Sequence, residues 1–207
     1  MGIAERKERE KEDVRRRILE AAHDLFETSG YENVTMRAVA DAIEYSPTTI
    51  YHHFASKEDL VQALCFADFE KLSQAMGDRP LPENPVDRIR TLGHAYATFA
   101  IANPNHYRFM FMTAGDWKKD ANEENTPPAR SYAFLRDAVV GAMDQGHFEK
   151  GDVDLVAQIL WSGIHGVVSL IITFKPEQFP RVPPRPGLIE AAMETTLRGL
   201  LVERKDK

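Results

Sequence analysis

The sequence predicts an all-α fold of about nine helices, with a small N-terminal three-helix head and a larger C-terminal helical body. Apolar residues recur every three or four positions and show no strand-like alternation, which is typical of helices. Most of the expected helices follow a Ser, Thr, Asn or Asp that can cap them, and proline often stands at the first helical position. Proline-rich stretches at 77–85 and 175–187 interrupt these patterns and mark connections.

The first helix is expected to start near Asp13 and to end at Gly30, a residue that tolerates left-handed geometry. Its apolar side chains form one stripe: Val14, Ile18, Ala21, Ala22 and Leu25. Thr35 caps the second helix, 36–43, and Ser46 caps the third, in which Pro47 is the first residue. The third helix should end near His53 and Phe54, with Ile50 and Phe54 facing the core of the head.

A fourth helix is expected to follow Ser56, and the body follows it. The helices expected in the body cover 85–102, 104–114, 127–145, 152–174 and a last segment ending near 202. Residues 116–125 are polar and are expected to form a loop. The predicted domains are therefore 1–56 for an N-terminal arm and the head, 57–76 for a connecting helix, and 77–207 for the body.

Composition excludes several classes of protein. Cys65 is the single cysteine, so the chain can form no internal disulfide. The N-terminus is charged and has no apolar signal-peptide region. The longest apolar stretch, 163–174, contains polar residues and is expected to be too short to cross a bilayer. We therefore expect a cytoplasmic protein with no membrane association.

The charge argues against nucleic acid as a partner. The chain carries a net charge of -6, and residues 1–64 hold nine Lys and Arg against thirteen Asp and Glu, a net charge of -4. A DNA-binding domain usually has a basic footprint. An argument for DNA binding must therefore rest on the geometry of the helices rather than on net charge.

The first 54 residues have the form of a helix-turn-helix unit, in which the last helix enters the major groove. Thr48 and Thr49 suit base edges because each carries a hydroxyl and a methyl group. The segment Thr35-Met36-Arg37-x-Val39-Ala40-x7-Thr48-Thr49-Ile50-Tyr51-x-His53-Phe54-x2-Lys57-x2-Leu60 resembles the DNA-binding signature of the TetR family. The preceding Ile18-Leu19-x-Ala21-Ala22-x2-Leu25-Phe26-x3-Gly30-Tyr31 also resembles it.

The resemblance implies that Arg37, Thr48 and Thr49 contact bases. It also implies that Thr35, Tyr51, His53 and Lys57 hold the DNA backbone, while His52 touches either. Tyr45 and Ser46, in the turn before the third helix, are the two further candidate DNA-contacting residues. One departure concerns the turn, which usually reads Gly-Val/Ile-Ser in this family and reads Glu44-Tyr45-Ser46 here. Either a non-glycine residue accepts left-handed geometry, at about 1 kcal/mol, or the turn differs.

Some assignments in the head stay open. Tyr45 can reach the DNA backbone or pack on the head, and Tyr51 can point to DNA or join the core. Residues 15–17, three arginines, form either a solvated face or a second contact with phosphates. His52 and His53 diverge on a helix and do not form a metal pair.

The body carries many aromatic residues, as the linings of small-molecule sites do, although such residues are more often core. The candidate pocket consists of Tyr96, Phe99, Tyr107, Met110, Phe111, Phe134, Trp161 and His165. Trp161, His165 and Gly166 resemble a TetR subgroup named for a Trp-His-Gly motif. His165 is either a hydrogen-bonding group of that pocket or a satisfied core histidine.

The resemblance further implies a ligand-released repressor that binds a near-palindromic operator as a dimer, paired through its last two long helices, with a small apolar effector. Small residues on those helices would permit the pairing: Gly163, Gly166, Ser169, Ala191, Ala192, Thr195, Thr196 and Gly199. The main alternative is a small-molecule-binding or interaction protein with a degenerate DNA-binding head. An enzyme is disfavoured because no phosphate-loop, HExxH or GxSxG motif occurs. No cofactor and no metal is expected.

Overall fold

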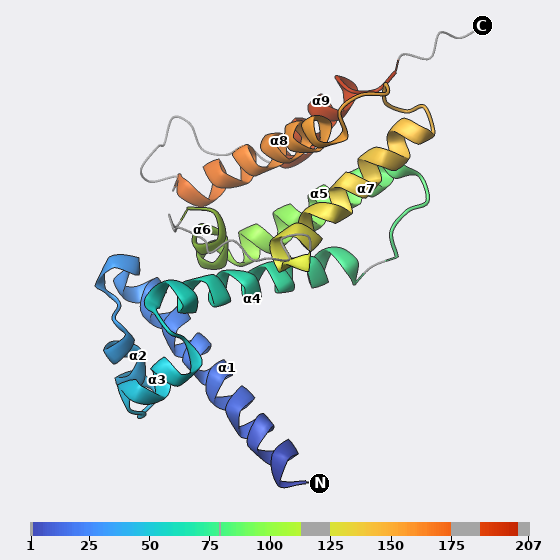
Figure 1. The fold of residues 1–207 in the computed structure, drawn as a ribbon. Helices are drawn as coiled ribbons and strands as arrows, with labels where there is room; N and C mark the ends of the chain where they lie inside the picture. Colours follow the sequence, from blue (N-terminus) through green and yellow to red (C-terminus); the bar gives the residue numbers. More distant parts are fainter. Residues whose placement is uncertain (1, 79, 113–124, 175–186, 203–207) are drawn as a thin grey trace, which may run out of the picture. The chain divides into compact units, whose positions relative to one another are not determined.

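The computed structural model describes residues 2–78, 80–112, 125–174 and 187–202, and helices make up most of this part of the chain (Figure 1). The predicted all-α fold is confirmed. The elements are α1 (Ile3–Ser29), the 3-10 helix η1 (Tyr31–Asn33), α2 (Met36–Ala42), α3 (Pro47–His53), α4 (Lys57–Gly77), α5 (Pro85–Ala102), α6 (Pro104–Met112), α7 (Pro127–Asp144), α8 (Val153–Thr173) and α9 (Leu188–Arg198).

The chain divides into two compact units. The first unit consists of residues 1–68 with 108–121, and the second consists of residues 69–107 with 122–207. The division falls inside α4, the helix that the sequence assigned to the connection, so each end of α4 is built into a different unit.

The first unit is built around the three helices of the head. Side chains from each helix meet in its core: Ile18, Ala22 and Phe26 of α1, Val39 and Ala40 of α2, and Ile50 with the adjoining Phe54 from α3, all of them buried. The predicted inward orientation of Ile50 and Phe54 is confirmed. Burial of these apolar faces supplies most of the stabilisation that such short helices need.

Helix α1 differs from its prediction. It begins at Ile3, so the predicted start near Asp13 is wrong. Residues 4–13 are all exposed, and ion pairs one helical turn apart support them, such as Arg6 with Glu10 at 2.8 Å. Hydrophobic periodicity predicts only the part of α1 that packs on the core, because the exposed part carries charged pairs and has no apolar stripe.

The second unit packs α7, α8 and α9 around α5. Its helices begin where their caps predict, since the side chains of Asn84, Thr126 and Asp152 accept hydrogen bonds from the first turns of α5, α7 and α8. Helix α9 ends at Arg198, a turn before the predicted end near Val202. Leu201 then forms an isolated bridge with Phe148.

Helix α8 is more apolar and longer than the 163–174 stretch suggested. Its 21 residues are long and apolar enough to cross a membrane by length and composition, and 28% of its most apolar window is buried within one chain. The bounds of α8 agree with the predicted 152–174, so this finding corrects only the estimate that the apolar stretch is too short to cross a bilayer. One side of α8 packs on α5, α7 and α9, which is the behaviour of a helix belonging to a folded core.

Candidate functional site

The turn between α2 and α3 sets the direction of α3. Glu44 adopts φ 60°, the left-handed conformation, and Tyr45 N–H donates to the Ala40 carbonyl at 3.0 Å. This is a Schellman-type helix end, which usually has glycine at the left-handed position. The expected strain is therefore present in the turn: a non-glycine residue holds the geometry that the family's glycine would provide.

Arg17 of α1 braces this turn from one side. Its guanidinium donates to the Ile43 carbonyl at 3.3 Å and to the Tyr45 hydroxyl at 3.4 Å, and it lies 5.2 Å from the centre of the Tyr45 ring. Tyr45 is half-buried, so its ring packs on the head. A contact between its hydroxyl and DNA stays a prediction.

Helix α3 presents a polar outer face. Thr48, Tyr51 and His52 are exposed, and Tyr51 retains 54% of its accessible surface, which excludes the alternative that it joins the core. The Ser46 hydroxyl caps the helix by accepting from Thr49 N–H at 3.2 Å, and the two hydroxyls lie 3.0 Å apart. The buried side of α3 fixes the rotation of the helix about its axis. The exposed side chains therefore lie on its outer side.

His53 ends α3 in a positively charged setting. It is half-buried, and burial lowers the pKa of its imidazole, as do the nearby cations Arg15 and Lys11 of α1. The Arg15 guanidinium lies 4.4 Å from the centre of the Phe54 ring. At neutral pH His53 is therefore uncharged and can donate or accept a hydrogen bond.

The starts of α2 and α4 lie in the same unit. Thr35 accepts from Ala38 N–H at 3.1 Å, and Ser56 accepts from Asp59 N–H at 3.1 Å. Arg37 is 83% exposed, with Asp41 4.0 Å away. The Lys57 ammonium lies 5.9 Å from the centre of the Phe26 ring.

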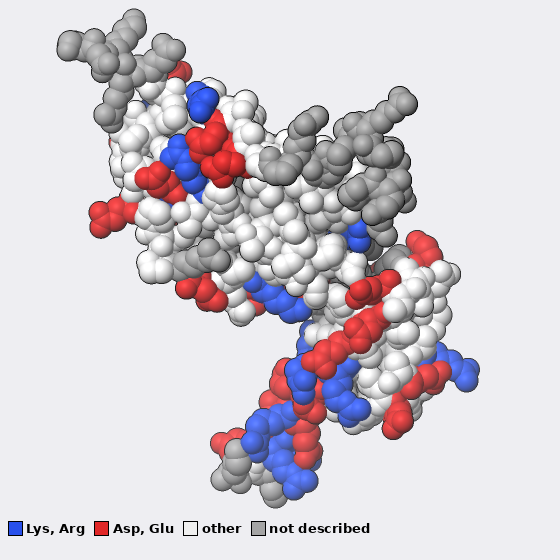
Figure 2. Space-filling view, turned by 180° about the vertical axis from the view of Figure 1, so that it is seen from behind, with Lys and Arg blue, Asp and Glu red and all other residues white. Residues whose placement is uncertain are grey.

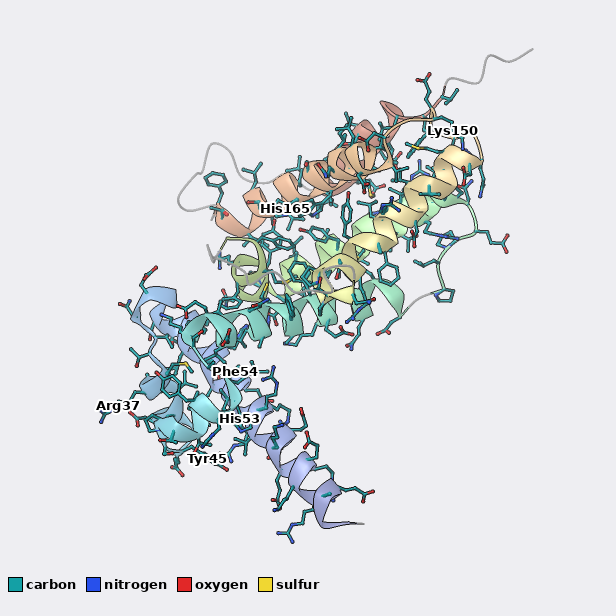
Figure 3. The ribbon with its side chains drawn as sticks, viewed as in Figure 1. Arg37, Tyr45, His53, Phe54, Lys150 and His165 are labelled. Atoms are coloured by element: carbon teal, nitrogen blue, oxygen red, sulfur yellow. The ribbon has the colours of Figure 1, made fainter. Side chains whose placement is uncertain are left out.

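The ten predicted DNA-contacting residues thus fall on the cap of α2, the turn, α3 and the cap of α4. Figure 3 shows Arg37 and Tyr45 at the outer edge of the α2–α3 pair, and His53 and Phe54 on the side of α3 toward α1. This arrangement offers hydroxyls, an imidazole and a guanidinium on one polar surface. Their individual contacts with DNA stay predictions.

The second unit holds a polar cluster centred on His165. The Tyr96 hydroxyl lies 2.8 Å from His165 Nδ1, and the Tyr107 hydroxyl lies 3.0 Å from the same atom. Tyr107 also donates to the His165 carbonyl at 3.2 Å, and the Trp161 ring lies 5.3 Å from the imidazole, centre to centre. Three helices, α5, α6 and α8, therefore contribute to one group, which we call the His165 cluster: Tyr96, Tyr107, Trp161, His165 and Ser169.

Burial determines the charge state of this cluster. It lowers the pKa of His165 and raises the pKa of Tyr96 and Tyr107, and both directions favour the neutral forms that these groups have at pH 7. A neutral imidazole has one acceptor nitrogen, and Tyr96 can donate to Nδ1 when the proton is on Nε2. Trp161 and Ser169 bond in turn to the hydroxyls of Tyr96 and Tyr107.

Four of the predicted pocket residues belong to this cluster: Tyr96, Tyr107, Trp161 and His165. Phe134 lies elsewhere in the second unit, where its ring would be 3.2 Å from a Cβ placed on Gly77. Met110 and Phe111 belong to the first unit. Phe99 is half-buried on α5. Sequence reasoning missed Ser169 as part of the cluster, although its spacing of four residues after His165 was the available signal.

The small residues of α8 and α9 fall into two groups: some lie between the two helices of one chain, and others face outward. A Cβ on Gly163 would lie 2.9 Å from Thr196 Oγ1, so this pair permits close packing of α8 on α9 within one chain. Gly166, in contrast, has open space. The outer face of α8 exposes Leu155, Ile159 and Leu170 at 56%, 44% and 48%. On α9 the small residues Ala191 and Thr195 are also exposed.

Known proteins resemble both parts of the chain. Residues 18–64 match the bacterial regulatory proteins of the tetR family, and residues 89–196 match the tetracyclin repressor-like C-terminal domain. The HTH-type transcriptional regulator UidR of Escherichia coli (strain K12) is 42% identical over 62 residues, 30% of this chain. The match spans 32% of UidR, about a third of its length.

Two further proteins match over most of the chain. The uncharacterized HTH-type transcriptional regulator YobS of Bacillus subtilis (strain 168) is 22% identical over 189 residues, 91% of this chain and 93% of YobS. The solved structure of a protein with unknown function from Rhodococcus sp. RHA1 has a TM-score of 0.74 at 22% identity, over 91% of this chain and 96% of that one. At this identity the structure supports the fold alone.

Proposed function

Because the chain belongs to the tetR family of bacterial regulatory proteins, we propose that it is a cytoplasmic DNA-binding transcriptional repressor. It binds a near-palindromic operator as a homodimer and is released by a small, mostly apolar effector. The observation that carries this proposal is the outer face of α3, where polar side chains stand exposed on a capped helix held by a defined turn.

The head reads DNA in two ways. Thr48, Thr49 and Arg37 contact base edges in the major groove, where hydroxyl, methyl and guanidinium groups discriminate between base pairs. The DNA backbone is held by Thr35, Tyr45, Ser46, Tyr51, His53 and Lys57, and His52 contacts either. The contacts with the DNA backbone fix the position of α3 on the duplex, and the contacts with the bases determine which DNA sequence is recognised.

The dimer forms through α8 and α9 of two chains. An exposed apolar helix face in a soluble protein marks an interface, and Leu155, Ile159 and Leu170 form such a face on α8. Gly166 and Ala191 permit close approach of the partner helices. A symmetric dimer presents two heads to two half-sites, so the operator is a near-palindrome.

The effector binds in the second unit, near the His165 cluster. The cluster's tyrosines, tryptophan and imidazole are neutral, which favours an uncharged molecule with an apolar body and a hydrogen-bonding group. The packing of Trp161 on His165 supports assignment to the Trp-His-Gly subgroup. The effector binds more tightly to the conformation of the dimer in which the spacing of the two heads does not match the two half-sites. Its binding therefore weakens DNA binding, with a coupling free energy of about 1–3 kcal/mol.

The second candidate is an effector-binding or interaction protein whose head no longer binds DNA. The net charge of -4 over residues 1–64 and the acidic Glu44 in the turn favour it. It differs from the repressor in one measurable respect, because it would select no sequence from a library of duplexes.

In vitro selection from random duplex DNA tests the proposal. The repressor is expected to enrich a palindrome, and an Arg37→Ala, Tyr51→Phe variant is expected to lose it. The matched control is Arg136→Ala, Tyr132→Phe, which changes the same residue types in the second unit, where both contact Asp154. Failure of the folded, dimeric wild type to enrich any sequence would exclude the repressor and leave the second candidate.

A further inference from the structure

The N-terminal half of α1 extends beyond the head. Residues 4–13 are exposed, and Figure 1 shows this end of the helix running past α2 and α3. It contributes no buried surface to the core of the head. Its sequence is almost wholly charged, and in Figure 2 Lys, Arg, Asp and Glu side chains cover this part of the molecule.

The charges of this segment are sorted by helical face. Lys7, Lys11 and Arg15 are four residues apart and therefore form one stripe, which we call the basic stripe. Two arginines on the other sides of the helix are paired with carboxylates: Arg6 with Glu10, and Arg16 with both Asp13 and Glu20. Those pairs offset the charges of Arg6 and Arg16, whereas Lys7, Lys11 and Arg15 place three cations in a row on one face.

The basic stripe begins beside the candidate recognition helix. Arg15 stacks on Phe54, the residue that follows α3. Lys11 and Arg15 both lie close enough to His53 to depress the pKa of its imidazole. Lys7 stands one turn further out on the same face. The stripe therefore continues the polar surface of α3 outward along α1.

Glu8 and Glu12 are acidic neighbours of the stripe, and Glu12 opposes the effect of Lys11 and Arg15 on the pKa of His53. Glu8 forms an ion pair with Lys11. It lies 3.8 Å from Lys11, and both side chains are more than 60% exposed. An exposed pair at this distance contributes little and is screened by salt, so a stronger anion can replace the carboxylate. The stripe's cations are spaced about 6 Å apart along the helix axis, which suits a row of anions rather than a single one.

We propose that the N-terminal half of α1 is a second DNA contact, in which Lys7, Lys11 and Arg15 hold successive phosphates outside the base pairs that α3 reads. This proposal rests on the proposed function, since it requires an operator-bound head. It assigns the three arginines at 15–17 different roles. Arg15 contacts phosphate, Arg16 stays in its ion pairs, and Arg17 braces the turn.

The test compares two double variants of the full-length protein that remove the same charge from the same helix. Lys7→Ala, Lys11→Ala acts on the stripe, and Arg6→Ala, Arg9→Ala acts on the other faces. Affinity for the selected operator is measured by fluorescence anisotropy over a range of salt concentrations. Each lost phosphate contact makes the slope of log affinity against log salt shallower by about 0.9.

Four lost contacts per dimer should reduce the slope by about 3.6 and the affinity at about 0.15 M salt by at least tenfold. The control should change either quantity far less. Hydroxyl-radical footprints should show backbone protections outside the selected palindrome that disappear only with the stripe variant. Equal effects of the two variants, or an unchanged slope and footprint, would overturn the proposal while operator recognition stands. A wild type that binds no operator would overturn both proposals.

Discussion

Glu44 stands in the turn that sets the direction of α3. Substitutions at this position can separate the effect of its backbone strain from the effect of its charge. Its φ of 60° places an L-residue with a long side chain in left-handed geometry. Its carboxylate is also exposed beside the residues that we assign to DNA. Glu44→Gln removes the charge and keeps the backbone strain. Glu44→Gly removes both.

The expected change in stability follows from the cost of the left-handed backbone and from the conformational freedom of glycine. Left-handed geometry costs a non-glycine residue about 1–2 kcal/mol, and replacement by glycine removes this cost. The greater freedom of glycine in the unfolded chain offsets about 0.5–1 kcal/mol of the resulting stabilisation. Glu44→Gly should therefore stabilise the first unit by about 0.5 kcal/mol, or raise its unfolding midpoint by about 2–4 °C. Glu44→Gln should leave the midpoint unchanged.

Operator affinity follows the charge rather than the strain. Removing a carboxylate near phosphates in each head should raise the affinity of the dimer about three- to tenfold for both variants, less at high salt. Calorimetry measures the midpoint, and anisotropy with the selected operator measures the affinity. The reasoning is refuted if glycine gives no more stability than glutamine, or if affinity rises only with glycine.

Three further predictions address the other parts of the molecule. Tyr96→Phe removes the hydroxyl that bonds to His165 Nδ1 and should destabilise the second unit by about 1–3 kcal/mol in urea unfolding; a loss below about 0.5 kcal/mol would exclude the network. DNA phosphates oppose the cations that lower the pKa of His53, so the bound state takes up protons and affinity should rise as pH falls from about 7.5 to about 6. His53→Gln should flatten that profile in anisotropy at constant ionic strength, and an unchanged profile contradicts this role. Leu155→Glu with Ile159→Glu should yield a folded monomer in analytical ultracentrifugation, whereas a persistent dimer would show that this face of α8 is not the interface.

The elements that local chemistry determines were predictable from the sequence. Asn84, Thr126 and Asp152 each accept hydrogen bonds from the helix that follows, and the prolines after Asn84 and Thr126 fit the first helical position. Ser46 and Pro47 define the start of α3 in the same way. Because a cap and an apolar stripe together fix the rotation of a helix, the buried side of α3 could be assigned correctly.

The features that depend on charge pairing or on distant contacts were not predictable. The first turns of α1 contain no apolar stripe, so their helical form could not be inferred from periodicity. The pocket candidates were chosen by residue type, which cannot separate Tyr107, part of the His165 cluster, from Met110, which falls in the first unit. Ser169 was read as a small residue for helix pairing, because its bond to Tyr107 depends on how α6 packs against α8.

The acidity of the head has a physical consequence for recognition. Beyond a Debye length of about 8 Å, DNA meets a head whose net charge is -4, which does not attract it. At contact, DNA meets the three cations of the basic stripe and the polar side chains on the outer face of α3. Such a distribution weakens non-specific binding, which depends on overall charge, more than it weakens binding to an operator that fits the surface. Under the proposed phosphate contacts, the position of Lys7, Lys11 and Arg15 on one face of α1 matters more for DNA binding than the count of charges does.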